Sequence, residues 1–323
     1  MSVQVLAGGL ESTVQDDGRH GWRHLGIGCA GALDRYSMAV ANLLVGNAID
    51  APVIEAALTG PTLRFDRAAR IALCGATTDA RVGGTEIPDW RPVDLPAGSE
   101  LHVGRCKVGA RVTLAIAGAW SVPKVLGSAS TDLRGGFGGV RGRSLAQGDR
   151  LLVGRAAEVG SRALRIAPWW IDPAPDLDFT APAVIRVLRG HDATDPADAL
   201  CSGPWRVAAA SNRQGLRLEG TPLALAAGAA PISRRISEPV APGTVQLPAG
   251  GQPIVLLADA QSHGGYPRIG HAIDCDLPRL GQLRPGDTVR FQPCTAADAA
   301  RLQRERAARL ARIALAIAGR ARH

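Results

Sequence analysis

A dense set of chemically active side chains follows a short apolar stretch in the last quarter of the sequence. Residues 252–258, QPIVLLA, have the apolar character and flanking turn residues of a buried strand. The residues after this stretch supply a carboxylate, an amide, a hydroxyl, an imidazole, a phenol and a guanidinium, together with two glycines: Asp259, Gln261, Ser262, His263, Gly264, Gly265, Tyr266 and Arg268. Paired glycines allow the backbone to approach a ligand closely. The pattern favours a ligand site over the alternative, a plain hairpin with polar decoration.

A second polar cluster follows an alternating strand pattern at residues 3–7. Gln15, Asp16 and Arg19 stand beside a glycine at a turn. Together with Gln246 and Gln252 they look like orienting groups, because amides and a guanidinium suit a small polar substrate that carries carboxylate and amide functions. Farther along, Asp34 and Gly46 are placed to cap a helix at residues 36–45.

Three of these residues are candidates for proton transfer. Asp16, Asp259 and His263 have side chains that could exchange protons near neutral pH if their pKa values were suitably shifted. Asp259 could equally cap a turn, and His263 could equally be an exposed loop residue. The sequence contains neither a Walker-type phosphate loop nor a Gly-x-Ser-x-Gly nucleophile elbow.

A glycine-rich, basic segment occupies residues 135–143. Its backbone N–H groups and arginines, Arg143 among them, could hold a phosphate or carboxylate. The alternative is a mobile surface loop, and the sequence does not decide between the two.

One pattern recurs along the chain and indicates related β domains. The pattern is a leucine, then a turn with glycine at the backbone position that favours this residue, then a strand in which apolar and polar residues alternate. It occurs at residues 95–103, 145–153 and 283–291. A proline-rich stretch at 167–175 is the expected linker. We therefore expect a β domain at 1–166, a second β domain at 176–293 and a basic helical tail at 295–323.

Composition and charge narrow the class of protein. The six cysteines are scattered singly, so we do not expect a metal site or a disulfide framework. We expect reduced thiols in a cytoplasmic protein. No export signal and no membrane-spanning run is apparent. The formal net charge is +8, but the segment from Thr295 onward contains seven arginines and only two acidic residues. Because most of the excess belongs to this amphipathic tail, which has no interleaved aromatics, we expect a docked surface helix and no nucleic-acid or membrane partner.

The ordered motifs resemble the KipA family, also called the 5-oxoprolinase C-subunit (PxpC), biotin-dependent carboxyltransferase or allophanate hydrolase subunit 2-like family. The resemblance runs from about residue 5 to about residue 292. It rests on seven segments in the family's order: 13–19, 41–47, 128–131, 142–149, 243–248, 251–256 and 264–267.

The sequence departs from the family pattern at several positions. Ser262 and His263 replace two threonines, and Arg268 replaces a lysine, keeping the charge without the ability to shuttle a proton. His191 stands in a segment that often reads Gly-Pro-Gln, and Gln214 replaces a methionine. These changes bear on the substrate and leave the expected fold intact.

The resemblance implies a mainly β fold with two cyclophilin-like β-barrel domains and few helices. It implies a protein that acts with KipI-like and LamB/YcsF-like partner subunits in the ATP-dependent opening of 5-oxoproline to glutamate. Asp16, Asp259 and His263 would then be catalytic. The 15–19 and 259–268 turns, with Arg143, Gln246 and Gln252, would line a composite substrate site at the interface with the KipI-like partner. Two alternatives stay open: a urea carboxylase-like carboxyl transfer, with biotin on another chain, and a non-enzymatic regulator that binds a KipI-like partner.

Overall fold

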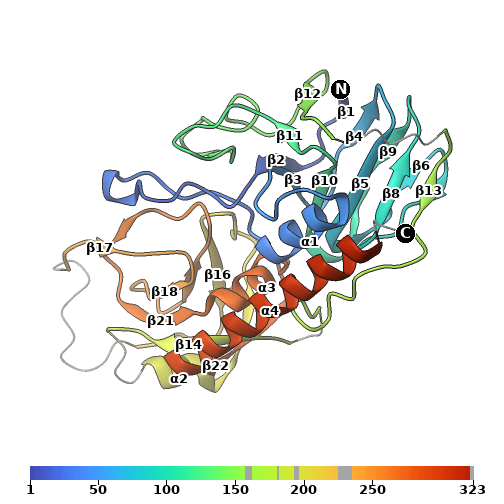
Figure 1. Ribbon diagram of the computed structural model, residues 1–323. Coiled ribbons are helices and arrows are strands. Elements are labelled where there is room, and N and C mark those ends of the chain that lie inside the picture. Colours follow the sequence, from blue (N-terminus) through green and yellow to red (C-terminus); the bar gives the residue numbers. More distant parts are fainter. Residues whose placement is uncertain (157–161, 180–181, 193–195, 225–234, 321–323) are drawn as a thin grey trace. The chain divides into compact units, whose positions relative to one another are not determined.

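The chain divides into two compact units. The computed structural model describes all residues except 157–161, 180–181, 193–195, 225–234 and 321–323 (Figure 1). The first unit comprises Met1–Arg19, Ala30–Leu177 and Ala308–His323, and the second comprises His20–Cys29 and Asp178–Ala307. The division at Leu177 follows the proline-rich stretch. The domain limits 1–166, 176–293 and 295–323 stay a prediction.

The first unit is built from two antiparallel sheets. Its seven-stranded sheet has the order β11-β12-β1-β4-β9-β6-β7, and its six-stranded sheet has the order β13-β8-β5-β10-β3-β2. The elements are β1 (Ser2–Ala7), β2 (Glu11–Gln15), α1 (Arg35–Val45), β3 (Val53–Ala57), β4 (Thr62–Phe65), β5 (Ala69–Thr78), β6 (Arg81–Val82), β7 (Thr85–Glu86), β8 (Pro92–Leu95), β9 (Glu100–His102), β10 (Cys106–Ile116), β11 (Trp120–Ser121), β12 (Arg150–Val153) and β13 (Arg165–Ile166).

One apolar core fills the space between these sheets. Val3 and Val5 of β1 and Leu63 of β4 enter it from one sheet, and Ile71 of β5 and Leu114 of β10 enter it from the other. Alternate residues of β1 are buried, as the period of two in a strand requires. Each fully buried aliphatic side chain contributes roughly 1.5–3 kcal/mol to the stability of the fold. A core of valine, leucine and isoleucine therefore compensates for the scarcity of aromatic residues.

Helix α1 has the limits that its sequence predicts to within one residue. Asp34 accepts a hydrogen bond from the Ser37 N–H at 2.8 Å, and Gly46 ends the helix at φ 81°. The helix packs on β5 and β10 of the same unit. The cap role of Asp34 is confirmed.

The second unit contains a closed barrel of strands in the order β14-β21-β18-β19-β16-β15-β22. Its elements are η1 (Arg23–Leu25), β14 (Ala183–Arg189), α2 (Pro196–Ser202), β15 (Pro204–Val207), β16 (Gly215–Glu219), β17 (Glu238–Pro239), β18 (Thr244–Gln246), β19 (Ile254–Leu256), β20 (His263–Gly264), β21 (Arg268–Ala272), η3 (Asp274–Asp276), α3 (Leu277–Gly281) and β22 (Thr288–Pro293). The mainly β fold with few helices is confirmed. The closed barrel belongs to this unit, whereas the described strands of the first unit form two sheets.

The recurring turn has the same geometry in both units. Gly98, Gly148 and Gly286 all have positive φ, at 80°, 91° and 92°. In two of the turns an aspartate carboxylate accepts from the N–H three residues before it: Asp149 from Ala146 and Asp287 from Arg284, each at 2.8 Å. A shared backbone conformation and a shared side-chain bond support the repetition inferred from sequence.

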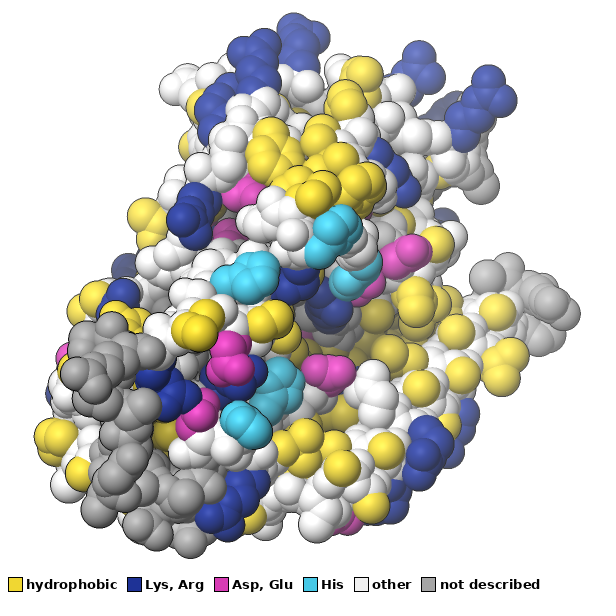
Figure 2. Space-filling view, turned by 90° about the vertical axis from the view of Figure 1, so that its left-hand side faces the viewer, with side chains coloured by type: hydrophobic (Ala, Val, Ile, Leu, Met, Phe, Trp, Pro, Cys, Tyr) yellow, Lys and Arg dark blue, Asp and Glu magenta, His cyan; other side chains and the backbone are white. Residues whose placement is uncertain are grey.

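The chain continues into a long basic helix, α4 (Ala296–Arg320). Thr295 begins it as a cap, accepting from the Asp298 N–H at 3.1 Å and donating to the Asp298 carboxylate at 2.6 Å. The expected C-terminal helix is confirmed up to Arg320, and the last three residues of the predicted tail lie outside the described residues. In the part of the chain that is described, no helix is long and apolar enough to cross a membrane. On the face shown in Figure 2, Lys and Arg side chains are dispersed among apolar, acidic and histidine side chains.

Candidate functional site

In the first unit, the carboxylate of Asp16 is enclosed by hydrogen-bond donors. Only 6% of the residue is exposed. The donors are the hydroxyls of Ser128 and Ser130, at 2.6 and 2.5 Å, and the N–H groups of Ala129 and Gly18, at 2.6 and 2.9 Å. Burial alone would raise the pKa of Asp16, but these bonds outweigh it and hold the pKa below its ordinary value. An ionised carboxylate saturated in this way is a poor proton acceptor, so the geometry favours a positioning role over proton transfer.

Gln15 and Arg19 are also committed to the fold of this turn. The Gln15 amide donates to the Thr13 hydroxyl at 2.9 Å and to the Thr131 carbonyl at 3.2 Å, while its oxygen accepts from the Gly31 N–H at 3.1 Å. The fully buried Arg19 donates to the Val125 and Ser130 carbonyls.

The Arg19 guanidinium also lies over the Phe137 ring, 4.6 Å from its centroid. Together with the Asp16 contacts, these bonds tie β2 to residues 125–137. The 15–19 turn is therefore a buried hydrogen-bonded junction, and its side chains are occupied by protein groups.

The Arg143 guanidinium, expected to hold an anion, binds a carboxylate of this chain. Two bonds of 2.8 Å join it to both oxygens of Asp149, and a third joins it to the Ser144 carbonyl. This ion pair lowers the pKa of Asp149. Because Asp149 belongs to the recurring turn, Arg143 stabilises that turn, and an anion would have to displace Asp149 to reach it.

In the second unit, Asp259 is held by a basic partner that the sequence did not indicate. The Arg213 Nε and Nη2 atoms lie 2.9 and 3.0 Å from the two oxygens of Asp259. Both side chains are nearly fully buried. This two-point, buried contact directs both carboxylate oxygens at Arg213, which favours a structural role for Asp259 over proton transfer.

Three of the predicted binding residues, Gln246, Gln261 and Gly264, lie close together in the second unit. The Gln246 oxygen accepts from the Gln261 amide at 3.5 Å. Gln246 is 1% exposed, and within the described residues its Nε2 atom has no hydrogen-bond acceptor. A Cβ at position 264 would lie 2.4 Å from this atom, so any larger residue there would displace the Gln246 amide. A buried N–H donor without an acceptor costs about 1–3 kcal/mol, so the Gln246 amide is an unusual feature of the described residues.

Residues 20–29, which belong to the second unit, hold this region in place through Arg23. The Arg23 guanidinium donates to the Gln261 carbonyl at 3.0 Å and to the Val240 carbonyl. These carbonyls flank the strand pair of β17 and β20, in which Glu238 lies opposite Gly264. Arg23 thus positions the backbone beside Gln246.

The remaining residues of the 259–268 turn differ in their surroundings. Arg268 lies opposite Gln246 in the pairing of β18 with β21, and its guanidinium pairs with Glu238 at 2.7 Å. The His263 ring accepts or donates a hydrogen bond with the Ser262 hydroxyl at 2.9 Å and is exposed. Tyr266 is 42% exposed. A Cβ at Gly265 would have its nearest neighbour at 3.7 Å, so this glycine is not sterically required.

A carboxylate of the 190–192 segment joins this turn. Asp192 accepts from the Arg268 N–H at 2.8 Å and pairs with the Arg235 guanidinium. Burial opposes ionisation of Asp192, but the bonds from Arg268 and Arg235 keep its pKa below the ordinary value. The turn is thus anchored by charge at its C-terminal end.

Gln252 lies apart from this group. Its amide both donates to and accepts from the Gly220 backbone, each at 3.0 Å, as a strand neighbour would. The structure therefore unites Gln246, Gln261, Gly264 and Arg268, and leaves Gln252 and Asp259 in separate structural contacts. The 15–19 turn belongs to the first unit.

Sequence reasoning missed Arg23, Asp192, Arg213 and the two serines as functional partners. The serine spacing at 128 and 130 was visible as a motif, but its contact with Asp16 was not. Among the described residues, no three His, Cys, Asp or Glu side chains gather in a way that would hold a metal ion.

Comparison with known proteins decides the family. The sequence profile described as "Carboxyltransferase domain, subdomain A and B" matches residues 25–293. The chain belongs to this carboxyltransferase-domain family. The resemblance inferred from the ordered motifs is confirmed.

Relatives of the carboxyltransferase-domain family include both separate proteins and parts of larger chains. The chain is 37% identical over 309 residues to the C subunit of 5-oxoprolinase from Escherichia coli K12, covering 94% of each protein. It is 32% identical to the urea amidolyase of Saccharomyces cerevisiae, covering 90% of this chain and 16% of that protein. The crystal structure of Kluyveromyces lactis urea carboxylase matches with a TM-score of 0.88 at 29% identity, over 97% of this chain and 29% of that one. The chain thus spans less than a third of the urea-metabolising relatives.

Proposed function

We propose that the chain is the C subunit of an ATP-dependent 5-oxoprolinase complex, which opens 5-oxoproline, or a related small lactam or amide, to glutamate. The observation that carries this proposal is the match to the Escherichia coli 5-oxoprolinase protein along 94% of both chains. A match along nearly a whole subunit supports an equivalent place in a complex better than a match to one part of a long enzyme does. The partners would be a KipI-like protein and a LamB/YcsF-like protein.

Gln246 is the residue that we assign to substrate binding. Its buried Nε2 atom has no acceptor among the described residues, whereas a lactam offers a carbonyl oxygen. A preorganised N–H donor in a buried setting would bind this oxygen and orient the lactam. Gly264, which leaves room for the amide, and Gln261, which holds the amide oxygen, would fix its direction.

We infer that this chain contributes binding groups, and that much of the chemistry lies with its partners. A lactam is a stable amide, and transfer of a phosphoryl group from ATP to its oxygen, with release of ADP, would leave a carbon open to water. After water adds, the ring C–N bond would break with the nitrogen leaving as the amine of glutamate, and hydrolysis of the remaining acyl phosphate would release phosphate. Asp16 and Asp259, two of the three candidate proton carriers, are fixed by four donors and by Arg213. The exposed His263 keeps its candidacy for proton transfer, and the exposed Tyr266 keeps its candidacy for contact with substrate or with the KipI-like partner.

The setting that we propose for the complex is the cytoplasm. All six cysteines are free thiols, and four of them are buried. Reduced, buried cysteines suit a reducing compartment.

A second function is favoured by the family description and by the urea amidolyase match. In it the chain would transfer a carboxyl group from carboxybiotin, carried on another protein, to a small amide. Gln246 would bind the amide carbonyl in this reaction as well.

One preparation tests both functions. The chain would be co-expressed with its KipI-like and LamB/YcsF-like partners, and the purified complex would be assayed for ATP-dependent glutamate release from 5-oxoproline. The same complex would be assayed for incorporation of labelled bicarbonate into urea in the presence of a biotin carrier protein and its carboxylase. Glutamate release supports the first proposal. Carboxylation without glutamate release would replace it with the second.

A further inference from the structure

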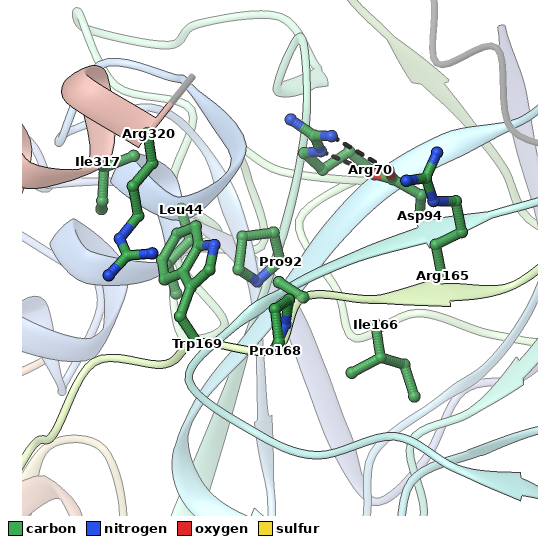
Figure 3. A pocket seen from close by; sticks show the side chains of 11 residues that line it. Leu44, Arg70, Pro92, Asp94, Arg165, Ile166, Pro168, Trp169, Ile317 and Arg320 are labelled. Carbon is green, nitrogen blue, oxygen red and sulfur yellow. Dashed lines mark hydrogen bonds and ion pairs between the residues drawn. The ribbon is translucent and has the colours of Figure 1, made fainter. Parts of the chain in front are cut away.

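A cavity of about 460 Å³ lies in the first unit, outside all the residues assigned above (Figure 3). Three stretches far apart in sequence line it: the end of α1, the neighbouring strands β5, β8 and β13 with the residues after β13, and the last turns of α4. Its volume is in the range of sites that bind small organic molecules. The proline-rich stretch and the basic tail, which the proposed function leaves without a role, both contribute to it.

One part of the lining is apolar and includes an aromatic plane. Leu44 of α1, Pro92 of β8, Ile317 of α4 and Trp169 form this wall. The Arg320 guanidinium lies 5.2 Å from the centroid of the Trp169 ring, which holds the indole in place by a cation–π contact. A flat apolar body would pack against such a wall.

The charged part of the lining has more cations than anions. Arg70 is neutralised by Asp94 through bonds of 2.7 and 3.0 Å. Arg165 lies directly opposite Asp94 in the strand pairing, on the side away from Arg70. Asp94 has thus already engaged one arginine. In the described part of the chain, neither Arg165 nor Arg320 forms an ion pair with a carboxylate, and the cavity keeps two uncompensated positive charges.

These two charges lie apart. Figure 3 shows Arg320 and Trp169 on one side of the cavity, and Arg165 with the Arg70–Asp94 pair on the other. Pro92 and Pro168 lie between them. An occupant with an acid at only one end would leave the other arginine uncompensated.

We propose that this cavity binds a small organic anion with a flat apolar body and an acidic group at each end. Arg165 and Arg320 bind the two acidic groups, since guanidinium groups form strong charge-assisted bonds with carboxylates and phosphates. Trp169, Leu44 and Ile317 cover the apolar body. This binding does not depend on the proposed 5-oxoprolinase function and can be measured on the chain alone.

Isothermal titration calorimetry of the full chain with naphthalene-2,6-dicarboxylate and with 2-naphthoate tests the proposal. The dicarboxylate is expected to bind saturably at one site, and at least about tenfold more tightly than the monocarboxylate, since each charge-assisted bond is worth about that factor. Arg165→Gln and Arg320→Gln are each expected to weaken dicarboxylate binding by roughly tenfold. Trp169→Ala weakens binding of both probes.

Matched controls separate the site from general charge. Arg150→Gln on β12 and Arg312→Gln on α4 remove exposed arginines that do not line the cavity, and both are expected to bind like the unmodified chain. Because Arg165 and Arg320 are themselves exposed, their variants should melt at the unmodified temperature. The proposal is overturned if neither probe binds at millimolar concentration. It is equally overturned if the Arg165 and Arg320 variants bind the dicarboxylate as tightly as the two controls do.

Discussion

Arg213 and Asp259 form a two-point ion pair inside the second unit, with Nε–Oδ2 and Nη2–Oδ1 distances of 2.9 and 3.0 Å. The pair joins the loop before β16 to the residues after β19. Asp259, a candidate catalytic acid from its sequence position, therefore anchors the turn that leads to Gln261.

Removing one member of this pair is expected to destabilise the second unit strongly. Arg213→Met leaves a buried carboxylate without its cation, at a cost of about 3–5 kcal/mol in the free energy of unfolding. The double variant Arg213→Met/Asp259→Leu should lose less than the sum of the two single losses, because no buried charge remains. Urea denaturation of the four proteins measures this coupling. Additive losses would contradict a direct interaction.

Asp16 is expected to act on stability through its charge. Asp16→Asn should lower the free energy of unfolding at pH 7 by about 2–3 kcal/mol, since charge-assisted bonds are lost. The folded pKa of Asp16 lies below its ordinary value of 3.8. The contribution of its charge is therefore fully present above pH 3.8 and is lost as pH falls through the lower, folded pKa.

Urea denaturation across the acid range checks both parts of this prediction. The gap between the unmodified chain and Asp16→Asn should be constant above about pH 5 and should narrow below pH 4. Asp17→Asn, at the half-exposed neighbouring position, is the control and should change stability little. A gap that widens in acid would refute the ionised structural role.

Asp89 should show the opposite dependence on pH. Its carboxylate accepts from the Thr78 N–H and hydroxyl at 3.2 and 3.1 Å, yet burial raises its pKa from 3.8 to about 6. A raised folded pKa gives stability that is present below pH 3.8 and is lost as pH rises through 6.

Asp89→Asn removes this titration. Relative to the unmodified chain, the variant should therefore gain about 2 kcal/mol in the free energy of unfolding between pH 4 and pH 7. Denaturation at the two pH values, compared between the two proteins, gives this change directly. A difference that is the same at both pH values would mean that Asp89 titrates normally.

Replacing Gln246 and replacing Gln252 are expected to have opposite effects on stability and on turnover. Gln246→Met removes a buried donor that has no acceptor among the described residues, so stability should be unchanged or higher while turnover of the complex falls at least about tenfold. Gln252→Met breaks two bonds to Gly220, so stability should fall by roughly 1–2 kcal/mol while turnover is kept. Melting curves and steady-state rates of both variants provide the check. Equal turnover in the two would remove Gln246 from the site.

The local features of this chain could be predicted from its sequence, whereas the long-range ones could not. The limits of α1 follow from Asp34 and Gly46, which act within a few residues of themselves. The three turns at Gly98, Gly148 and Gly286 follow from a repeated pattern and have the expected positive φ. Family motifs and strand patterning together were enough to predict a mainly β fold.

The roles of the polar side chains depended on partners far away in the chain. Asp16 binds Ser128, 112 residues later, and Arg23 binds the Gln261 carbonyl, 238 residues later. A carboxylate beside glycine at a turn looks the same in sequence whether it faces a substrate or two buried serines. Gln246 and Gln252 were both predicted as orienting groups from their side-chain type. The burial of Gln246, and the lack of an acceptor for its Nε2 atom among the described residues, distinguish it from Gln252.

We propose that this chain is an obligate part of a 5-oxoproline-opening enzyme. The most direct measurement is the initial rate of ATP-dependent glutamate release from 5-oxoproline by the KipI-like and LamB/YcsF-like partners, with and without this chain at equal molar amount. We predict release with all three proteins and at least about a hundredfold less without this chain, the size of effect that loss of a preorganised part of an active site produces. The same rate in its absence would show that this chain is not required for 5-oxoproline opening.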